Sequence, residues 1–123
     1  MSEHTEQAAL FEWAAWNQSK DAALNMLYAV PNGGKRDKAT AARLKAEGVK
    51  AGVPDIVLPV ARNGYHGFYI ELKVGKNTTS KEQVIWLTAL AAEGYCVDVS
   101  YGWQEAARKI AWYLGHDPKE LGL

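Results

Sequence analysis

The chain has 123 residues, of which 48% are hydrophobic and 23% are charged, and its 14 basic residues balance its 14 acidic residues. This length fits one domain, residues 1–123, and the composition is ordinary for a globular protein that buries a core without disulfides. Cys96 is the single cysteine, which excludes an intrachain disulfide and a zinc cluster built on cysteines. The N-terminal segment lacks the regions of a signal peptide, and no apolar run reaches the length of a membrane span, so we expect a cytoplasmic protein.

Hydrophobic periodicity and turn residues predict eight elements in the order α-β-α-β-β-α-β-α. The predicted helices cover residues 3–18, 38–47, 80–93 and 103–114, and the predicted strands cover residues 24–30, 56–60, 68–74 and 95–100. Ser80 and Gln83 have the spacing of a capping box at the start of the third helix. Strands mixed with helices in this way predict an α/β fold with a central mixed sheet flanked by helices. The tail 115–123 is expected to be loosely ordered.

The balanced total charge hides a local excess of basic residues. Residues 35–50 contain Lys35, Arg36, Lys38, Arg43, Lys45 and Lys50 against Asp37 and Glu47. Such a stretch can meet the phosphates of a nucleic acid. A solvated, charged helix face is the simpler interpretation, and charge alone favours it.

Three charged residues beside apolar strands carry the chemical signal. Asp55 enters the strand at 56–60, whereas Glu71 and Lys73 lie two residues apart in the next strand and therefore point to one face. Charge at such a place is costly unless a partner, a metal or solvent meets it. Two carboxylates can hold Mg²⁺ through oxygen ligands, and a neighbouring lysine can orient the water that attacks a phosphodiester. The alternative is a surface ion pair between Glu71 and Lys73 at an edge strand, which would stabilise little.

The hairpin register decides whether these residues share a face. Directly opposite residues of an antiparallel pair lie on the same face, so Asp55 joins Glu71 and Lys73 only if opposite residue numbers have an even sum, for instance Asp55 opposite Lys73. A tight turn centred on Asn63 and Gly64 would give an odd sum. We therefore predict a wider turn or a bulge within residues 62–67.

The ordered set of motifs resembles the PD-(D/E)xK nuclease superfamily and, more narrowly, the virus-type replication-repair nuclease (VRR-NUC) family. The motifs are GVPD at residues 52–55, the E-x-K motif at residues 71–73 and Gln83 in the next helix. The string PNGGKR at residues 31–36 is also similar to short phage and bacterial members. Either PD or E-x-K alone is a weak signal, but the ordered set extends over about residues 3–114 and is specific.

The resemblance implies a restriction-endonuclease-like core and a nuclease that depends on Mg²⁺ or Mn²⁺. It implies that Asp55, Glu71 and the backbone carbonyl of Leu72 bind the metal, and that Lys73 is the catalytic lysine. Gln83 would be the polar residue beside the site. The residues alone support a capping role for Gln83 equally well, and the two roles are compatible.

An acidic residue on the first helix often completes the metal site in this superfamily. Glu3 fits the family pattern E-x-x-x-Q together with Gln7, and Glu6 is the competing choice. Short stand-alone members are expected to be homodimers that cut branched DNA, such as Holliday junctions, in a bacterial or phage-infected cell. A two-fold dimer would supply the two active sites that symmetric incisions need.

The candidate DNA contacts lie outside the acidic site. They are Asn32, Gly33, Lys35, Arg36, Arg43, Lys50 and the turn residue His66. The tryptophans are more typical of a core or a dimer interface than of base-stacking platforms. Two alternative functions stay open: a restriction or nicking nuclease for ordinary duplex DNA, and a non-catalytic nucleic-acid-binding module.

Overall fold

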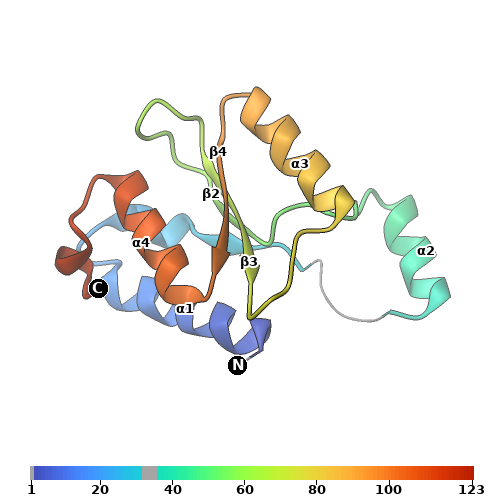
Figure 1. Cartoon of the computed structure of the whole chain (residues 1–123), viewed down its shortest axis with the longest axis horizontal. Coiled ribbons are helices and arrows are strands. Elements are labelled where there is room, and N and C mark those ends of the chain that lie inside the picture. The colour runs from blue at the N-terminus through green and yellow to red at the C-terminus, as the bar shows by residue number, and fades with distance from the viewer. Residues whose placement is uncertain (1, 32–35) are drawn as a thin grey trace.

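The computed structural model describes residues 2–31 and 36–123 (Figure 1). Its elements are α1 (Glu3–Asn17), η1 (Ala22–Met26), β1 (Tyr28–Ala29), α2 (Lys38–Ala46), β2 (Ile56–Leu58), β3 (Phe68–Lys73), α3 (Lys81–Ala92), β4 (Cys96–Tyr101), α4 (Trp103–Leu114) and η2 (Pro118–Leu121). Apart from the short 3₁₀ helices η1 and η2, this is the predicted order. None of the helices in the described ranges is long and apolar enough to cross a membrane.

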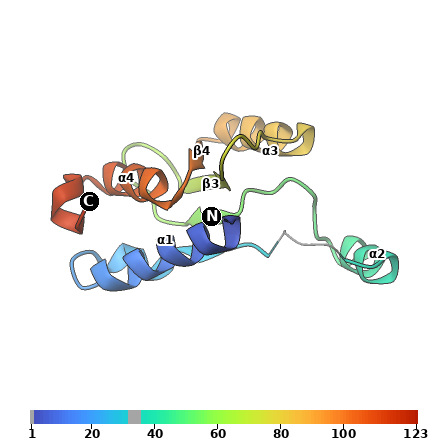
Figure 2. The ribbon, with the colours of Figure 1, turned by 60° about the horizontal axis from the view of Figure 1, so that its bottom comes forward.

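The strands form one mixed sheet in the order β1-β2-β3-β4, in which β3 is antiparallel to β2 and parallel to β4. Side chains alternate along β3: Phe68, Ile70 and Leu72 join the apolar core with residues of α1 and α4, so Glu71 and Lys73 point to the opposite face. Figure 2 shows α1 and α3 on opposite sides of the sheet. The predicted mixed sheet flanked by helices is therefore confirmed.

Helix α2 stands apart from this layered body (Figure 1), and none of its residues is buried. Its first turn is fixed locally, because the Asp37 carboxylate accepts hydrogen bonds from the Thr40 N–H at 2.7 Å and from the Thr40 hydroxyl at 3.1 Å. The α2 segment thus forms an arm that owes its helical state more to capping than to core packing.

The turn between β2 and β3 is tight. Tyr65 donates a hydrogen bond of 2.8 Å from its N–H to the Arg62 carbonyl, and Asn63 and Gly64 between them have φ angles of 53° and 82°. Positive φ at both central residues is what a two-residue turn of type I′ requires. The expectation of a wider turn is therefore wrong, and Arg62 opposite Tyr65 gives the odd register.

A bulge between this turn and the strands restores the even register. Leu58 pairs with Phe68, and Arg62 bridges Tyr65. Between these two pairs the chain has three residues on the β2 side, 59–61, but two on the β3 side, 66–67. The extra residue lies in 59–61, outside the predicted range, where Pro59 has no N–H to donate to a neighbouring strand.

Tyr113 of α4 stabilises this bulge. Its hydroxyl donates to the Val60 carbonyl at 2.6 Å and accepts from the Arg62 N–H at 3.3 Å, so it pairs backbone groups at the bulge. Its ring is 1% exposed and packs on Phe68 with 5.0 Å between ring centroids. The Tyr113 side chain thereby links the core to the bulged residues 59–61 of the hairpin.

The strand predicted for residues 24–30 is wrong over most of its length. Residues Ala22–Met26 form η1, and only Tyr28–Ala29 pair with β2. The Asp21 carboxylate begins η1 by accepting a hydrogen bond of 2.9 Å from the Ala23 N–H. A short apolar run fits a buried helix turn as well as a strand, and the cap decides between them here.

The tail 115–123 is ordered, contrary to expectation. Asp117 and Glu120 form a reciprocal capping box around a proline at the first position of η2. Leu121 is fully buried, and its carbonyl accepts a hydrogen bond of 2.7 Å from the Trp13 indole. The D-P-x-E pattern in the sequence is the signal for this helical turn.

Replacing Tyr113 by phenylalanine tests the role of its hydroxyl. Tyr113→Phe removes the partner of the Val60 carbonyl and the Arg62 N–H, and we expect the free energy of unfolding in urea to fall by about 1–2 kcal/mol. The matched control is Tyr101→Phe, whose hydroxyl donates to the Asn77 carbonyl at 2.9 Å on the exposed surface, where water replaces it. Equal losses in the two variants would contradict this role.

Candidate functional site

The hairpin register puts three charged residues on one face of the sheet. Ile56 pairs with Ile70, so Asp55, one residue before β2, is level with Glu71. The predicted even register is confirmed, and Asp55 shares the face of Glu71 and Lys73. The pairing offered as an example, Asp55 opposite Lys73, is wrong by two residues.

Backbone contacts hold Asp55 at the start of β2. Its Oδ2 accepts a hydrogen bond of 3.2 Å from the Leu72 N–H, and its own carbonyl accepts one of 2.7 Å from the Val30 N–H. The Val30 contact was not predicted, because it depends on the short pairing of β1 with β2. The Leu72 contact fixes the carboxylate against β3, and the Val30 contact holds the Asp55 backbone.

The Leu72 carbonyl faces the same side as Asp55. The N–H and C=O of a strand residue point to one side, and consecutive residues alternate. The Lys73 carbonyl accepts a hydrogen bond of 3.0 Å from the Gly102 N–H on the β4 side, and the Leu72 N–H donates to Asp55 on the β2 side. The Leu72 carbonyl therefore points to the β2 side, where it could bind the same metal ion as the Asp55 carboxylate.

Glu71 is a buried carboxyl group with an incomplete set of partners. Its residue is 2% exposed, and its Oε2 accepts a hydrogen bond of 2.9 Å from Gln83 Nε2 and lies 3.8 Å from Lys73 Nζ. Its Oε1 is buried, and no hydrogen-bond partner for it is found within the described part of the chain. A buried oxygen without a partner is costly and calls for a ligand or a proton.

The buried Glu71 carboxyl group lies beside that of Asp55, which is half-buried. The pKa of Glu71 is raised to about 8: burial is the largest cause, the hydrogen bond and negative charge of Asp55 also raise it, the Lys73 ammonium lowers it, and the charge of Glu3 adds a smaller increase. Each cause acts on the energy of the ionised carboxylate. Neutralising the negative charge of the Asp55 and Glu71 carboxyl groups therefore requires a bound proton or a cation.

Gln83 makes both of the contacts considered from the sequence. Its Oε1 accepts a hydrogen bond of 2.8 Å from the Ser80 N–H, and its own N–H donates to Ser80 Oγ at 3.2 Å, so the predicted capping box is confirmed. Its Nε2 donates to Glu71. One amide thus joins the start of α3 to the acidic site, while a part in catalysis stays a prediction.

The two acids of α1 differ in environment. Glu3 is exposed in the first turn, and its charge acts on the pKa of Glu71. Glu6 is buried, and its Oε1 accepts a hydrogen bond of 3.4 Å from the Trp103 N–H at the start of α4, where a negative charge is favourable. One Glu6 oxygen thus contacts α4, whereas its buried Oε2 has no hydrogen-bond partner within the described part of the chain, so the choice between Glu3 and Glu6 stays a prediction.

The donor set fits a hard divalent cation. No cluster of three or more His, Cys, Asp or Glu side chains suited to a metal occurs in residues 2–31 and 36–123. Asp55, Glu71 and the Leu72 carbonyl offer oxygen atoms, which Mg²⁺ and Mn²⁺ prefer over softer metals, and Mg²⁺ sites commonly keep several waters. The partnerless Glu71 Oε1 is the specific observation that agrees with such an ion.

The candidate DNA contacts fall into three groups. Arg36, Arg43 and Lys50 are exposed on or beside α2, whereas Asn32, Gly33 and Lys35 lie outside the described residues. His66 is exposed at the hairpin turn, where its ring meets Tyr95 edge-on at 5.8 Å between centroids. That turn precedes β3 and Glu71 lies near its far end, about 17 Å along the strand, so His66 is not part of the acidic site.

Comparison with known proteins agrees with this geometry. The VRR-NUC domain family model matches residues 2–104, a range that contains every residue of the acidic site. A solved structure of a VRR_NUC domain protein superposes with a TM-score of 0.79 at 30% sequence identity, covering 93% of this chain and 88% of that chain. Comparison with curated proteins gave no match. On the family match and this structural likeness, the chain belongs to the VRR-NUC family, a family of nuclease-type domains.

Proposed function

We propose that this protein is a Mg²⁺- or Mn²⁺-dependent endonuclease that hydrolyses phosphodiester bonds in branched DNA. The observation that carries the proposal is the buried contact of Glu71 with Asp55, Lys73 and Gln83 on one sheet face. Phosphodiester hydrolysis needs charge neutralisation at the phosphate, an oriented water and a stabilised leaving oxygen. Paired acids beside an amine suit those needs, whereas pure DNA binding does not require acids close to phosphate.

Lys73 is suited to assist the attack. Its residue is 8% exposed, and its Nζ lies 3.8 Å from Glu71 Oε2. In a site this dry an ammonium stabilises developing negative charge more strongly than it would in water. Gln83 holds the Glu71 carboxylate by a hydrogen bond of 2.9 Å and is a positioning residue.

Asp55, Glu71 and the Leu72 carbonyl are the groups that would hold the cation. A divalent ion bound there supplies Lewis-acid polarisation of the phosphate and a lowered pKa for its bound water. The protein's own contribution is a prearranged set of oxygens: the Leu72 N–H fixes Asp55 and Gln83 fixes Glu71.

A preference for branched DNA and a homodimeric state are the finer parts of the proposal. The likeness to short stand-alone VRR-NUC nucleases supports both, as well as a cytoplasmic place in a bacterial or phage-infected cell. Helix α3 supports the dimer, because Val84 and Ile85 on it are 48% and 59% exposed, and so apolar a helix is ordinarily covered. A monomer mass by light scattering under conditions where DNA is cut would remove the dimer from the proposal.

Substitution of the acidic site separates cleavage from binding. We expect Asp55→Asn and Lys73→Met each to lower the cleavage rate of a four-way junction with Mn²⁺ by at least about a hundredfold, because each removes a group that acts on the reacting phosphate or water. Junction binding without metal should change little. The matched controls are Asp98→Asn and Lys109→Met, which break an ion pair of 2.9 Å outside the acidic site.

The same assay compares a four-way junction, a flap and a linear duplex. Equal rates on all three substrates would replace the branched-DNA proposal by a nuclease for ordinary duplex. If the wild-type protein binds these substrates but cuts none of them with Mg²⁺ or Mn²⁺, the protein is instead a non-catalytic nucleic-acid-binding module.

The raised pKa of Glu71 predicts a pH-dependent stability without metal. The folded state holds the proton up to about pH 8, whereas the unfolded carboxyl releases it near its ordinary pKa, so the wild type loses stability as pH rises between the two, by at most about 1.4 kcal/mol per pH unit. The Glu71→Gln variant has no ionisable group at this position. In thermal unfolding, its stability relative to the wild type should therefore increase from pH 5 to pH 8. Mn²⁺ should restore wild-type stability most strongly at the upper end of that range, and parallel pH profiles would contradict the buried pair.

A further inference from the structure

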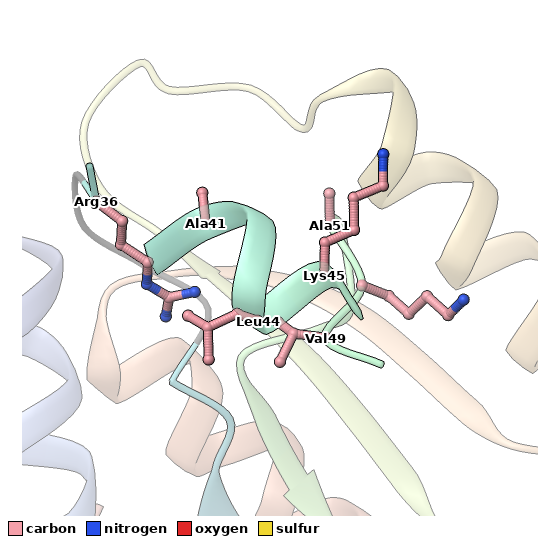
Figure 3. Close-up of a pocket in the computed structure, with 7 residues that line it drawn as sticks. Arg36, Ala41, Leu44, Lys45, Val49 and Ala51 are labelled. Carbon is pink, nitrogen blue, oxygen red and sulfur yellow. The ribbon is translucent and has the colours of Figure 1, made fainter. Parts of the chain in front are cut away.

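The arm formed by α2 and the loop after it encloses two adjoining hollows, of about 470 and 380 Å³. Arg36, Leu44, Val49 and Lys50 line both of them. Figure 3 shows Arg36 at one end of the larger hollow and Lys45 at the other, with Leu44 and Val49 between them. The floor is therefore aliphatic and the rim is cationic. We call this combined surface the α2 pocket.

The cationic rim has no acidic counterpart. Among the described residues that line the α2 pocket there is no Asp or Glu, and none of the ion pairs found in the described ranges involves Arg36, Lys45 or Lys50. The nearby Asp37 carboxylate is engaged with Thr40 at the start of α2. Arg36 is positioned at the rim by donating to the Pro31 carbonyl at 2.6 Å. Unpaired positive charge around a concave surface favours a phosphate-bearing ligand.

An aromatic ring completes the α2 pocket. Trp86 of α3 lines the smaller hollow together with Val49 and Val53, and no residue of α3 is buried in the core. The ring is half-buried, and its remaining surface borders the smaller hollow. A flat aromatic face beside free cations is the combination by which proteins hold unpaired bases, since every base can stack on it.

The α2 pocket adjoins the acidic site through three parts of the chain. Trp86 follows Gln83 by three positions on α3, so the two side chains are neighbours on one helix face. Val30, which lines the smaller hollow, donates its N–H to the Asp55 carbonyl at 2.7 Å. The loop after α2 touches the first turn of α3, because a Cβ on Gly52 would lie 2.6 Å from the Glu82 carbonyl carbon.

We propose that the α2 pocket binds an unpaired nucleotide of the DNA substrate next to the phosphate that is cut. The base lies on Trp86 and the aliphatic floor of Leu44 and Val49, and Arg36 and Lys50 hold its phosphates. This inference rests on the proposed nuclease function and adds a reason for selectivity: unpaired nucleotides occur at flaps and at open branch points, and a paired base cannot reach such a pocket without being unstacked. A second copy of the chain is the other conceivable occupant, but a rim of unpaired cations suits a polyanion better.

The test is a binding measurement that leaves the catalytic step out. Wild-type protein, Trp86→Ala and Trp86→Phe are titrated in EDTA, at fixed salt, into two fluorescent probes. One is a branched DNA with a single unpaired 2-aminopurine at the branch, and the other is a fully paired linear duplex. The matched control is Trp112→Ala, which removes another exposed tryptophan, 54% exposed on α4. Circular dichroism and thermal unfolding check that each variant is folded.

We expect Trp86→Ala to weaken binding of the branched probe by about 5- to 150-fold, the range for loss of one stacked base, and to leave duplex binding unchanged. Trp86→Phe should keep most of the affinity, and 2-aminopurine fluorescence should be quenched by the wild type and by Trp112→Ala but not by Trp86→Ala. Equal weakening on both probes, or no weakening, overturns the proposal. So does a fall in molecular mass of Trp86→Ala with unchanged DNA binding, which would make the α2 pocket a contact between copies.

Cleavage of the branched probe with Mn²⁺ is measured separately on the wild type. Absence of cutting together with Trp86-dependent binding would overturn the nuclease function and leave the nucleotide pocket. Cleavage together with DNA binding that does not depend on Trp86 would overturn the nucleotide pocket and leave the nuclease function.

Discussion

The pairing of β2 with β3 forces two acidic side chains together, and the rest of the site depends on that constraint. With Ile56 opposite Ile70, Asp55 is level with Glu71, and the Leu72 N–H holds the Asp55 carboxylate against β3. Glu71 is a buried carboxyl group with a pKa raised to about 8, and one of its oxygens has no hydrogen-bond partner among residues 2–31 and 36–123. A fold seldom keeps such a cost without use. A divalent cation bound there would account for this cost, because the ion would replace the mutual repulsion of the two carboxylates by shared coordination.

Other features of the molecule serve this arrangement. The bulge held by Tyr113 converts the odd register of a tight turn into the even register of the strands. Gln83 uses one end of its amide to begin α3 and the other to orient Glu71. In this way α3 is placed over the polar face of the sheet, and its next turn brings Trp86 to the α2 pocket. The acidic site and the α2 pocket thus share one helix.

Local pattern was sufficient to predict the order of the helices and strands and the shared face of Asp55, Glu71 and Lys73. Side chains alternate along a strand, so the E-x-K motif places Glu71 and Lys73 on one face. Asp55 shares that face only if opposite residue numbers in the hairpin have an even sum, which could be stated in advance. The bulge lies at residues 59–61 instead of within the predicted residues 62–67, and Tyr113, which holds it, lies about fifty positions away in sequence. Trp86 was grouped with the other tryptophans as typical of a core or a dimer interface. Its place beside the α2 pocket depends on how α2 and α3 are arranged in space, which local pattern does not reveal.

The most direct test of the central claim is a crystal structure of the wild-type protein grown with Mn²⁺, with anomalous diffraction recorded at the manganese edge. We expect an anomalous peak in contact with oxygens of Asp55 and Glu71 and with the Leu72 carbonyl. A peak held by other residues, or none at a Mn²⁺ concentration that supports cleavage, would show that these two acids are not the metal site.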